Sequence, residues 1–240
     1  MTSTCDGLHI EGDWIDVLRQ GGLDSFDAMY EASFAAPGSM HDRSRTGPLT
    51  LPGGRTLYLK CTVFTSLKQI ATDMLWLRRS EPLSERERFA LQRVARIGIT
   101  APRPVAWGQR RRCGLPWRGV LAMTVLPGVV LNEYLVSADG AEQTAALLAV
   151  GRTLRMLYEA GLSWPDLRVK HVYIDDGPSV GLLDLERLAT CRNAWGRQTA
   201  RQIECFCREL GDAGADEADV VAMLGAIGRP DMLRGGPGGG

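Results

Sequence analysis

The sequence predicts an α+β fold in two lobes, a small β-rich N-terminal lobe and a helical C-terminal lobe. Candidate strands bounded by Gly and Pro gather in the first half of the chain, and the longest amphipathic segments lie in the second half. Such segregation of strands from helices is typical of α+β folds. We place the lobes at residues 1–127 and 128–234, and we expect the Gly/Pro-rich residues 235–240 to be disordered.

Composition excludes several classes of protein. The 240 residues are 45% apolar, which is enough for a packed core, and 28 basic residues balance 28 acidic ones, so no net positive charge favours nucleic acid. The longest apolar stretch, Val120–Leu131, is broken by Pro127 and Gly128 and is too short to span a membrane. The first thirty residues contain no secretory signal, and the six cysteines form no CxxC pair. We therefore expect a cytoplasmic protein with reduced thiols, for which any membrane contact is peripheral.

The first half of the chain alternates weak helical signals with turns and strands. Residues 8–35 favour a weak helix, and residues 38–52 favour loop or irregular strand. A tight turn at residues 52–55 precedes a strand at 56–60, and a helix is expected over 66–79.

The next helix carries a stronger start signal. Ser84 and Glu87 have the spacing of a capping box, and the helix that they open is ended by Gly98. Two strands follow, at residues 105–109 and 118–126, with a basic connection between them.

The second half is mainly helical. Asp139 and Glu142 predict a capping box at the start of a long helix that Gly161 ends. Short strands are expected at residues 172–174 and 180–185, followed by further helix over 195–227.

Two acidic residues are placed for chemistry. Asp166 lies on the loop after the long helix, and Asp184 lies at the end of a strand that follows a hairpin. Two carboxylates at the mouth of one cleft suit metal-assisted phosphoryl transfer. One carboxylate orients the attacking hydroxyl and accepts its proton, and the other holds the metal that bridges the nucleotide phosphates.

The motifs around these acids resemble the protein-kinase-like fold and, more narrowly, the bacterial lipopolysaccharide kinase family, which phosphorylates heptose or Kdo sugars of the inner core. Asp166 and His171 match D-L-x-x-x-H, and residues 184–187, Asp-Leu-Glu-Arg, stand where ordinary kinases have D-F-G. The resemblance extends from about Leu57 to Leu188.

The resemblance implies an enzyme that uses ATP and Mg²⁺, and it makes the cytoplasmic face of the inner membrane the place for any peripheral membrane contact. It makes Asp166 the catalytic aspartate and Asp184 the metal ligand. His171 either holds Asp166 or a phosphate oxygen from outside the metal's ligand shell, or is itself a ligand in a site that accepts Mn²⁺, because Mg²⁺ prefers oxygen.

The resemblance also implies the nucleotide contacts. Lys60 would grip the ATP phosphates, with Glu87 as its carboxylate partner and Glu85 as the alternative partner. The adenine edge would be read by backbone groups of three consecutive residues, Thr124, Val125 and Leu126.

Several departures from ordinary kinases shape the expected substrate. The chain has no G-x-G-x-x-G and no A-P-E, and Trp164-Pro165 stands where His-Arg would be. These features favour a lipopolysaccharide core sugar or other glycan acceptor over a protein. Two alternatives stay open: a pseudokinase that binds nucleotide as a scaffold, and a small-molecule phosphotransferase of the aminoglycoside or choline kinase type.

Two basic segments have alternative interpretations. Residues 110–112, Arg-Arg-Arg, with Arg118 nearby, are expected to form a solvated hairpin tip, with an anionic lipid headgroup as the alternative partner. Residues 74–77, followed by Arg78 and Arg79, are expected to pack in the core, with a membrane face as the alternative.

Overall fold

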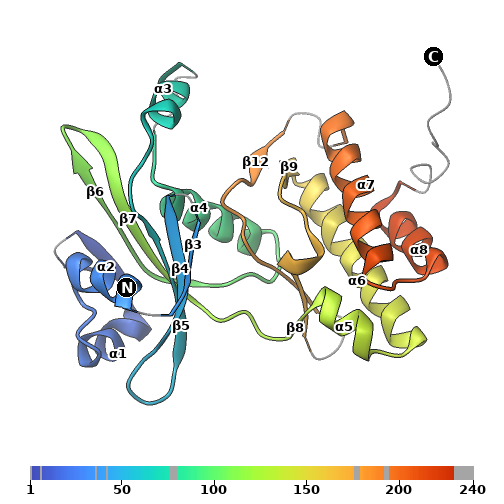
Figure 1. Ribbon diagram of the computed structural model, residues 1–240, viewed down its shortest axis with the longest axis horizontal. Coiled ribbons are helices and arrows are strands. Elements are labelled where there is room, and N and C mark those ends of the chain that lie inside the picture. The colour runs from blue at the N-terminus through green and yellow to red at the C-terminus, as the bar shows by residue number, and fades with distance from the viewer. Residues whose placement is uncertain are drawn as a thin grey trace. The chain divides into compact units, whose positions relative to one another are not determined.

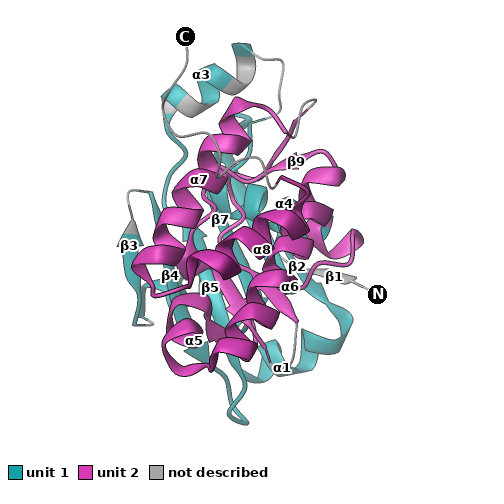
Figure 2. Ribbon diagram, turned by 90° about the vertical axis from the view of Figure 1, so that its right-hand side faces the viewer, with its two compact units in different colours: residues 1–92, 102–125 teal, residues 93–101, 126–240 magenta. Residues whose placement is uncertain are grey.

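The computed structural model describes residues 2–5, 7–35, 37–41, 43–75, 80–175, 179–191 and 195–229. The chain forms two compact units, residues 1–92 with 102–125 and residues 93–101 with 126–240, which Figure 2 shows in teal and magenta. Two predicted features fall outside the described residues, the disordered tail at 235–240 and residues 76–79 of the segment 74–79. No helix among the described residues is long and apolar enough to cross a membrane.

The first unit is built on an antiparallel sheet of seven strands in the order β1-β2-β6-β7-β5-β4-β3 (Figure 1). The strands are β1 (Thr2–Cys5), β2 (Leu8–Glu11), β3 (Ser39–His41), β4 (Ser44–Thr50), β5 (Thr56–Thr62), β6 (Pro104–Arg112) and β7 (Leu115–Thr124). The helices are α1 (Ile15–Gln20), α2 (Phe26–Ala35), α3 (Leu67–Leu75) and α4 (Leu83–Arg96), with a 3₁₀ turn at Gly12–Trp14 before α1.

Strand β5 shows how the sequence places a charged group in this unit. Alternate residues of a strand face opposite sides of the sheet. Leu57, Leu59 and Cys61 therefore enter the apolar core that α1 and α2 cover, while Lys60 and Thr62 face α4 on the other side. The alternation over residues 57–62 thus buries three apolar side chains on one face and directs Lys60 toward α4 on the other.

The second unit is mainly helical, with three short pieces of sheet. Its helices are α5 (Leu131–Ser137), α6 (Gly140–Glu159), α7 (Arg197–Asp212) and α8 (Glu217–Ile227), with a 3₁₀ turn at Val169–His171. Its strands are β8 (Val129–Val130), β9 (Leu162–Ser163), β10 (Val172–Ile174), β11 (Val180–Leu182) and β12 (Ala189–Thr190).

The predicted start of α6 is confirmed. Asp139 accepts a hydrogen bond from the Glu142 amide at 2.9 Å, and the Glu142 carboxylate accepts one from the Asp139 amide at 3.1 Å. The apolar face of the helix is fully buried at Leu147, Leu154 and Leu157. Local capping and periodicity thus specify this helix.

The predicted capping box of α4 is wrong. The helix begins at Leu83, so Ser84 lies inside its first turn. Thr62 Oγ1 of β5 accepts from the Ser84 amide at 3.0 Å and donates to the Ser84 hydroxyl at 3.2 Å, and the Glu87 carboxylate meets Lys60. Both side chains are committed to the neighbouring strand, because burial against β5 competes with the local cap.

The N-terminal segment also differs from the prediction. Instead of one weak helix, residues 8–35 hold a strand, a 3₁₀ turn and the helices α1 and α2. Strand β2 pairs with β6, about a hundred residues away along the chain, and four residues are too few for their alternation to be recognised.

Gly151 of α6 allows a close approach to α8, which lies beside it in Figure 1. A Cβ at this position would lie 2.5 Å from the Met223 carbonyl oxygen and 2.8 Å from Ala226 Cβ. We expect Gly151→Ala to lower the free energy of unfolding by about 1–3 kcal/mol because the backbones would be forced apart. Gly225→Ala on α8, where nothing lies within 4 Å, is the matched control and should raise it by about 0.5–1 kcal/mol. Urea unfolding of both variants checks this, and equal effects would contradict it.

Candidate active site

The first unit buries an ion pair between β5 and α4. Lys60 Nζ lies 2.6 Å from Glu87 Oε2, and the two side chains are only 7% and 2% exposed. Two desolvated charges of this kind stabilise a fold little compared with apolar residues of the same size. Their burial is therefore better explained by a ligand that uses them than by stability.

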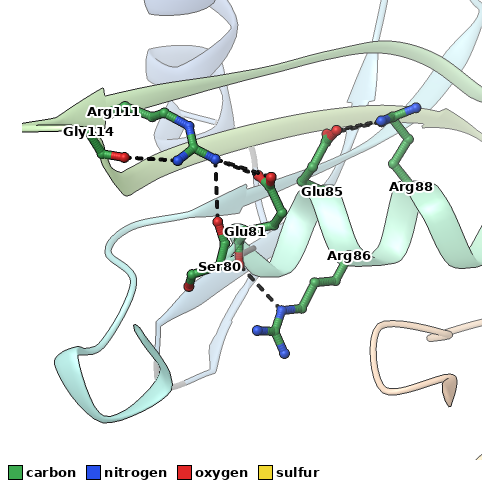
Figure 3. A network of polar contacts seen from close by, with 7 residues as sticks. All are labelled: Ser80, Glu81, Glu85, Arg86, Arg88, Arg111 and Gly114. Atoms are coloured by element: carbon green, nitrogen blue, oxygen red, sulfur yellow. Dashed lines mark hydrogen bonds and ion pairs between the residues drawn. The ribbon is translucent and has the colours of Figure 1, made fainter. Parts of the chain in front are cut away.

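Glu85, the alternative partner of Lys60, is engaged elsewhere. Its carboxylate accepts from Arg88 Nη2 at 2.5 Å and from Arg88 Nε at 3.0 Å, as Figure 3 shows. The Arg88 guanidinium also lies over the Phe89 and Trp107 rings, at 4.1 and 5.0 Å from their centroids. Glu87 is thus the carboxylate beside Lys60.

The second unit holds the loop that carries Asp166. The 3₁₀ turn at Val169–His171 follows it and turns the His171 ring back, so that Nδ1 lies 2.9 Å from the Asp166 carbonyl oxygen. A carbonyl only accepts hydrogen bonds, so Nδ1 carries a proton, and Nε2 is the ring nitrogen that faces Asp184 and is available to a metal. The His171 carbonyl in turn accepts from the Leu183 amide at 2.9 Å, which ties this loop to the residue before Asp184.

Asp184 has a backbone conformation that is rare for a residue with a side chain, with φ of +60°. Buried residues hold it there: Leu182 and Leu185 on either side are fully buried, and the Trp164 indole N–H donates to the Asp184 carbonyl at 3.3 Å. A left-handed aspartate fixed by its surroundings is typical of functional sites. Asp184 Oδ2 lies 3.6 Å from His171 Nε2.

The donor atoms around Asp184 suit a divalent cation. A carboxylate oxygen of Glu186 lies within 4.8 Å of one from Asp184, and His171 Nε2 is close to the latter carboxylate. Two carboxylates are the oxygen donors that Mg²⁺ prefers, and an imidazole whose other nitrogen is held by a carbonyl is a common ligand of transition metals.

Arg187, the last residue of the Asp-Leu-Glu-Arg motif, contacts Asp166. Its Nη1 donates to Asp166 Oδ1 at 3.0 Å, with 63% of the Arg187 side chain and 28% of the Asp166 side chain exposed. Arg168, only two residues after Asp166, instead forms an ion pair with Glu209 of α7. The sequence reasoning missed Arg187, Glu186 and Trp164; the only available signal was their position within or beside the two motifs.

The three residues predicted to read adenine differ in their backbone contacts. The Thr124 amide donates to the Arg103 carbonyl at 2.9 Å, and Thr124 Oγ1 accepts from the Arg103 amide. The Thr124 N–H is therefore already used within the first unit. Val125 is 44% exposed and Leu126 is buried against Gly181. The recognition of adenine stays a prediction for Val125 and Leu126.

A pocket of about 450 Å³ between α7 and α8 lies apart from these motifs within the second unit. It is lined by Ile203, Glu204, Cys207, Arg208, Gly211, Ala215, Glu217, Val220 and Leu224. Burial raises the pKa of the Cys207 thiol to about 11, so the thiol stays protonated near neutral pH and is a poor nucleophile. We assign no chemistry to this pocket.

Comparison with known proteins identifies the family. The family model described as "Lipopolysaccharide kinase (Kdo/WaaP) family" matches residues 52–226, well over half of the chain. No curated protein matches. The solved structure "WaaP in complex with acyl carrier protein" is 19% identical, covers 95% of this chain and 90% of its own, and has a TM-score of 0.67. "Crystal structure of monomeric WbdD" is 18% identical over 73% of this chain and 38% of its own, with a TM-score of 0.47.

The first of these structures confirms the predicted fold class, since the likeness in fold covers almost the whole of both chains. The family match confirms the resemblance that the Asp166 and Asp184 motifs indicated, and with it that the chain is a kinase. The chain belongs to the lipopolysaccharide kinase (Kdo/WaaP) family.

Proposed function

We propose that this kinase transfers the γ-phosphate of ATP to a hydroxyl group of an inner-core sugar of lipopolysaccharide, a heptose or Kdo. One observation carries the proposal: within the second unit, His171 bonds the Asp166 carbonyl through its ring and accepts from the Leu183 amide, beside Asp184, through its own carbonyl, which holds the two loops in a single frame. A frame of this kind fixes a base and a metal ligand in relation to each other, and positioning is the main source of catalysis in phosphoryl transfer.

The roles follow from the chemistry of each side chain. Asp166 would accept a hydrogen bond from the acceptor hydroxyl and take its proton as the phosphoryl group moves. Asp184, with Glu186 and the Nε2 nitrogen of His171, would hold the divalent cation, which when bound neutralises charge on the nucleotide phosphates. Lys60 would bind the ATP phosphates, and Glu87 would keep its ammonium group oriented.

Arg187 would act through Asp166. Because its guanidinium donates to Asp166 Oδ1, it can hold the carboxylate in a fixed orientation, which leaves the other oxygen for the acceptor hydroxyl. Arg187 is therefore proposed as a positioning residue.

Removal of Arg187 tests this role. We expect Arg187→Ala to lower kcat by roughly 10- to 100-fold, the size of a lost hydrogen bond to a charged group, while KM for ATP changes little. Added guanidinium ion should restore part of the rate. Arg201→Ala, an exposed arginine on α7, is the control for loss of charge. If the free energy of unfolding falls by as much as the loss of rate corresponds to, and added guanidinium ion does not restore the rate, Arg187 has a merely structural role.

The proposed function is tested with the purified full chain, ATP, Mg²⁺ and lipopolysaccharide core oligosaccharides that end in Kdo or extend to heptose. We expect ATP consumption that depends on the oligosaccharide, and a product whose mass has increased by one phosphate. Mass spectrometry of fragments would then name the sugar. A protein that binds ATP without transferring phosphate to any core oligosaccharide would instead support the pseudokinase alternative.

A further inference from the structure

One face of the sheet in the first unit carries arginines over a row of aromatic rings. Helix α2 packs against β4, β5 and β7 (Figure 1). The residues Phe26, Tyr30 and Phe34 recur at four-residue spacing along α2, and the centroids of successive rings are 5.9 and 5.2 Å apart.

One arginine guanidinium lies over each of these three rings. Arg110 lies 5.0 Å from the centroid of the first ring, Arg118 lies 4.8 Å from that of the second, and Arg45 lies 5.8 Å from that of the third. With Arg112, which lies 5.7 Å from the Trp117 ring, these arginines form what we call the arginine face.

The sheet brings like charges together on this face. Arg110 and Arg118 are directly opposite each other on β6 and β7. Like charges in that position destabilise a sheet unless something offsets them. The aromatic rings offset part of the repulsion, and so does Asp27, which forms an ion pair with Arg110 at 3.1 Å. Within the described part of the chain, Arg112 and Arg118 have no carboxylate at ion-pair distance.

The neighbouring arginine shows the contrast. Arg111 points to the opposite side of the hairpin, where both oxygens of Glu81 lie 3.1 Å from its Nη2 (Figure 3). It also donates to the Gly114 and Ser80 carbonyls, at 2.9 and 3.3 Å. Within residues 110–112, the charge of Arg111 is therefore neutralised by Glu81. Arg112, together with Arg118, places its positive charge on the face of the sheet that α2 flanks.

Large apolar side chains border the arginine face. Met40 lies opposite Arg45 on the adjoining strand, and Leu115 lies opposite Arg112. The exposed fractions are 55% for Met40, 42% for Leu115, 41% for Phe34 and 38% for Trp117. Arginines mixed with exposed aromatic and aliphatic groups suit the boundary between lipid headgroups and acyl chains, where both kinds of side chain are favourably placed.

We propose that the arginine face binds the surface of an anionic phospholipid bilayer, with Arg112 and Arg118 meeting lipid phosphates and with Trp117 and Leu115 reaching the headgroup boundary. The positive charge of the arginines favours an anionic partner. The exposed apolar side chains at the border of the face favour a lipid over a fully polar polyanion. The β6–β7 hairpin is suited to membrane contact because it closes in a tight two-residue turn at Cys113 and Gly114, both of which have positive φ. The tight turn leaves Arg112 and Leu115 at the end of the hairpin. Vesicle binding through this face does not depend on kinase chemistry.

The test measures binding of the full chain to vesicles without ATP or acceptor. We expect the wild type to sediment with vesicles that contain phosphatidylglycerol, to bind those of phosphatidylcholine alone much less, and to be released by salt. Each arginine near an anionic surface contributes about fivefold, so Arg112→Gln/Arg118→Gln should reduce the partition coefficient roughly 25-fold. Trp117→Ala should also weaken vesicle binding, and it should reduce the part of the binding that remains at high salt.

The matched control is Arg197→Gln/Arg201→Gln, which removes the same charge from exposed positions on α7. It should leave vesicle binding within about twofold of the wild type, since only arginines near the lipid contribute. Circular dichroism of all variants verifies that they fold. Equal binding of the wild type to anionic and zwitterionic vesicles would overturn the proposal, and so would an equal loss of binding in both double variants. It would also be overturned if the chain does not bind vesicles but binds an acidic protein through the same arginines.

Discussion

Asp166→Asn is expected to reduce phosphoryl transfer by about 10²- to 10⁴-fold, the usual contribution of a positioned general base. The amide keeps the size of the side chain and can still accept from Arg187 through its oxygen, but it cannot take a proton. Affinity for ATP should be unchanged, because the proposed phosphate contacts belong to other residues. Single-turnover transfer to the core sugar, measured beside equilibrium ATP binding, separates the two effects.

The control for Asp166→Asn is Asp212→Asn, which removes an exposed carboxylate at the end of α7. It should leave both transfer and stability unchanged. Since most of the Arg187 side chain is exposed and the pair is open to water, Asp166→Asn should also unfold at nearly the wild-type denaturant concentration. Unchanged turnover in Asp166→Asn would remove this residue from the mechanism.

The parts of the site that the sequence predicted are those with local signals. Lys60 ends a predicted strand, and the resemblance names Glu87 of α4 as its first partner, which the ion pair confirms. Asp166 and Asp184 stand in motifs with fixed spacing, and the helix between residues 140 and 159 has its own cap and apolar stripe. Short-range rules were sufficient for these elements.

The contacts that the sequence did not predict join residues far apart along the chain. Nothing near Ser84 indicates that its amide will bond Thr62, and nothing near Arg187 indicates Asp166 rather than water. Trp164 is a further case, because its indole reaches the Asp184 carbonyl twenty residues on. In each case a tertiary hydrogen bond decides the role of a residue whose local pattern allows several.

Lys60→Met is expected to lower the free energy of unfolding by about 3–5 kcal/mol, because it removes the cation that lies 2.6 Å from the almost fully buried Glu87 carboxylate. The loss should appear as a lower midpoint in urea. Transfer activity should also be lost, but with the single variant that loss has two explanations, unfolding and removal of the phosphate contact.

The double variant Lys60→Met/Glu87→Leu separates these explanations. Apolar side chains of similar size in place of a buried ion pair are often neutral or stabilising, so most of the lost stability should return. ATP binding and transfer should not return, because the ammonium group proposed to hold the phosphates is still missing. A stable double variant that binds ATP as the wild type does would contradict the nucleotide role of Lys60. A double variant as unstable as Lys60→Met would show instead that the pair itself supports the packing of α4 on β5.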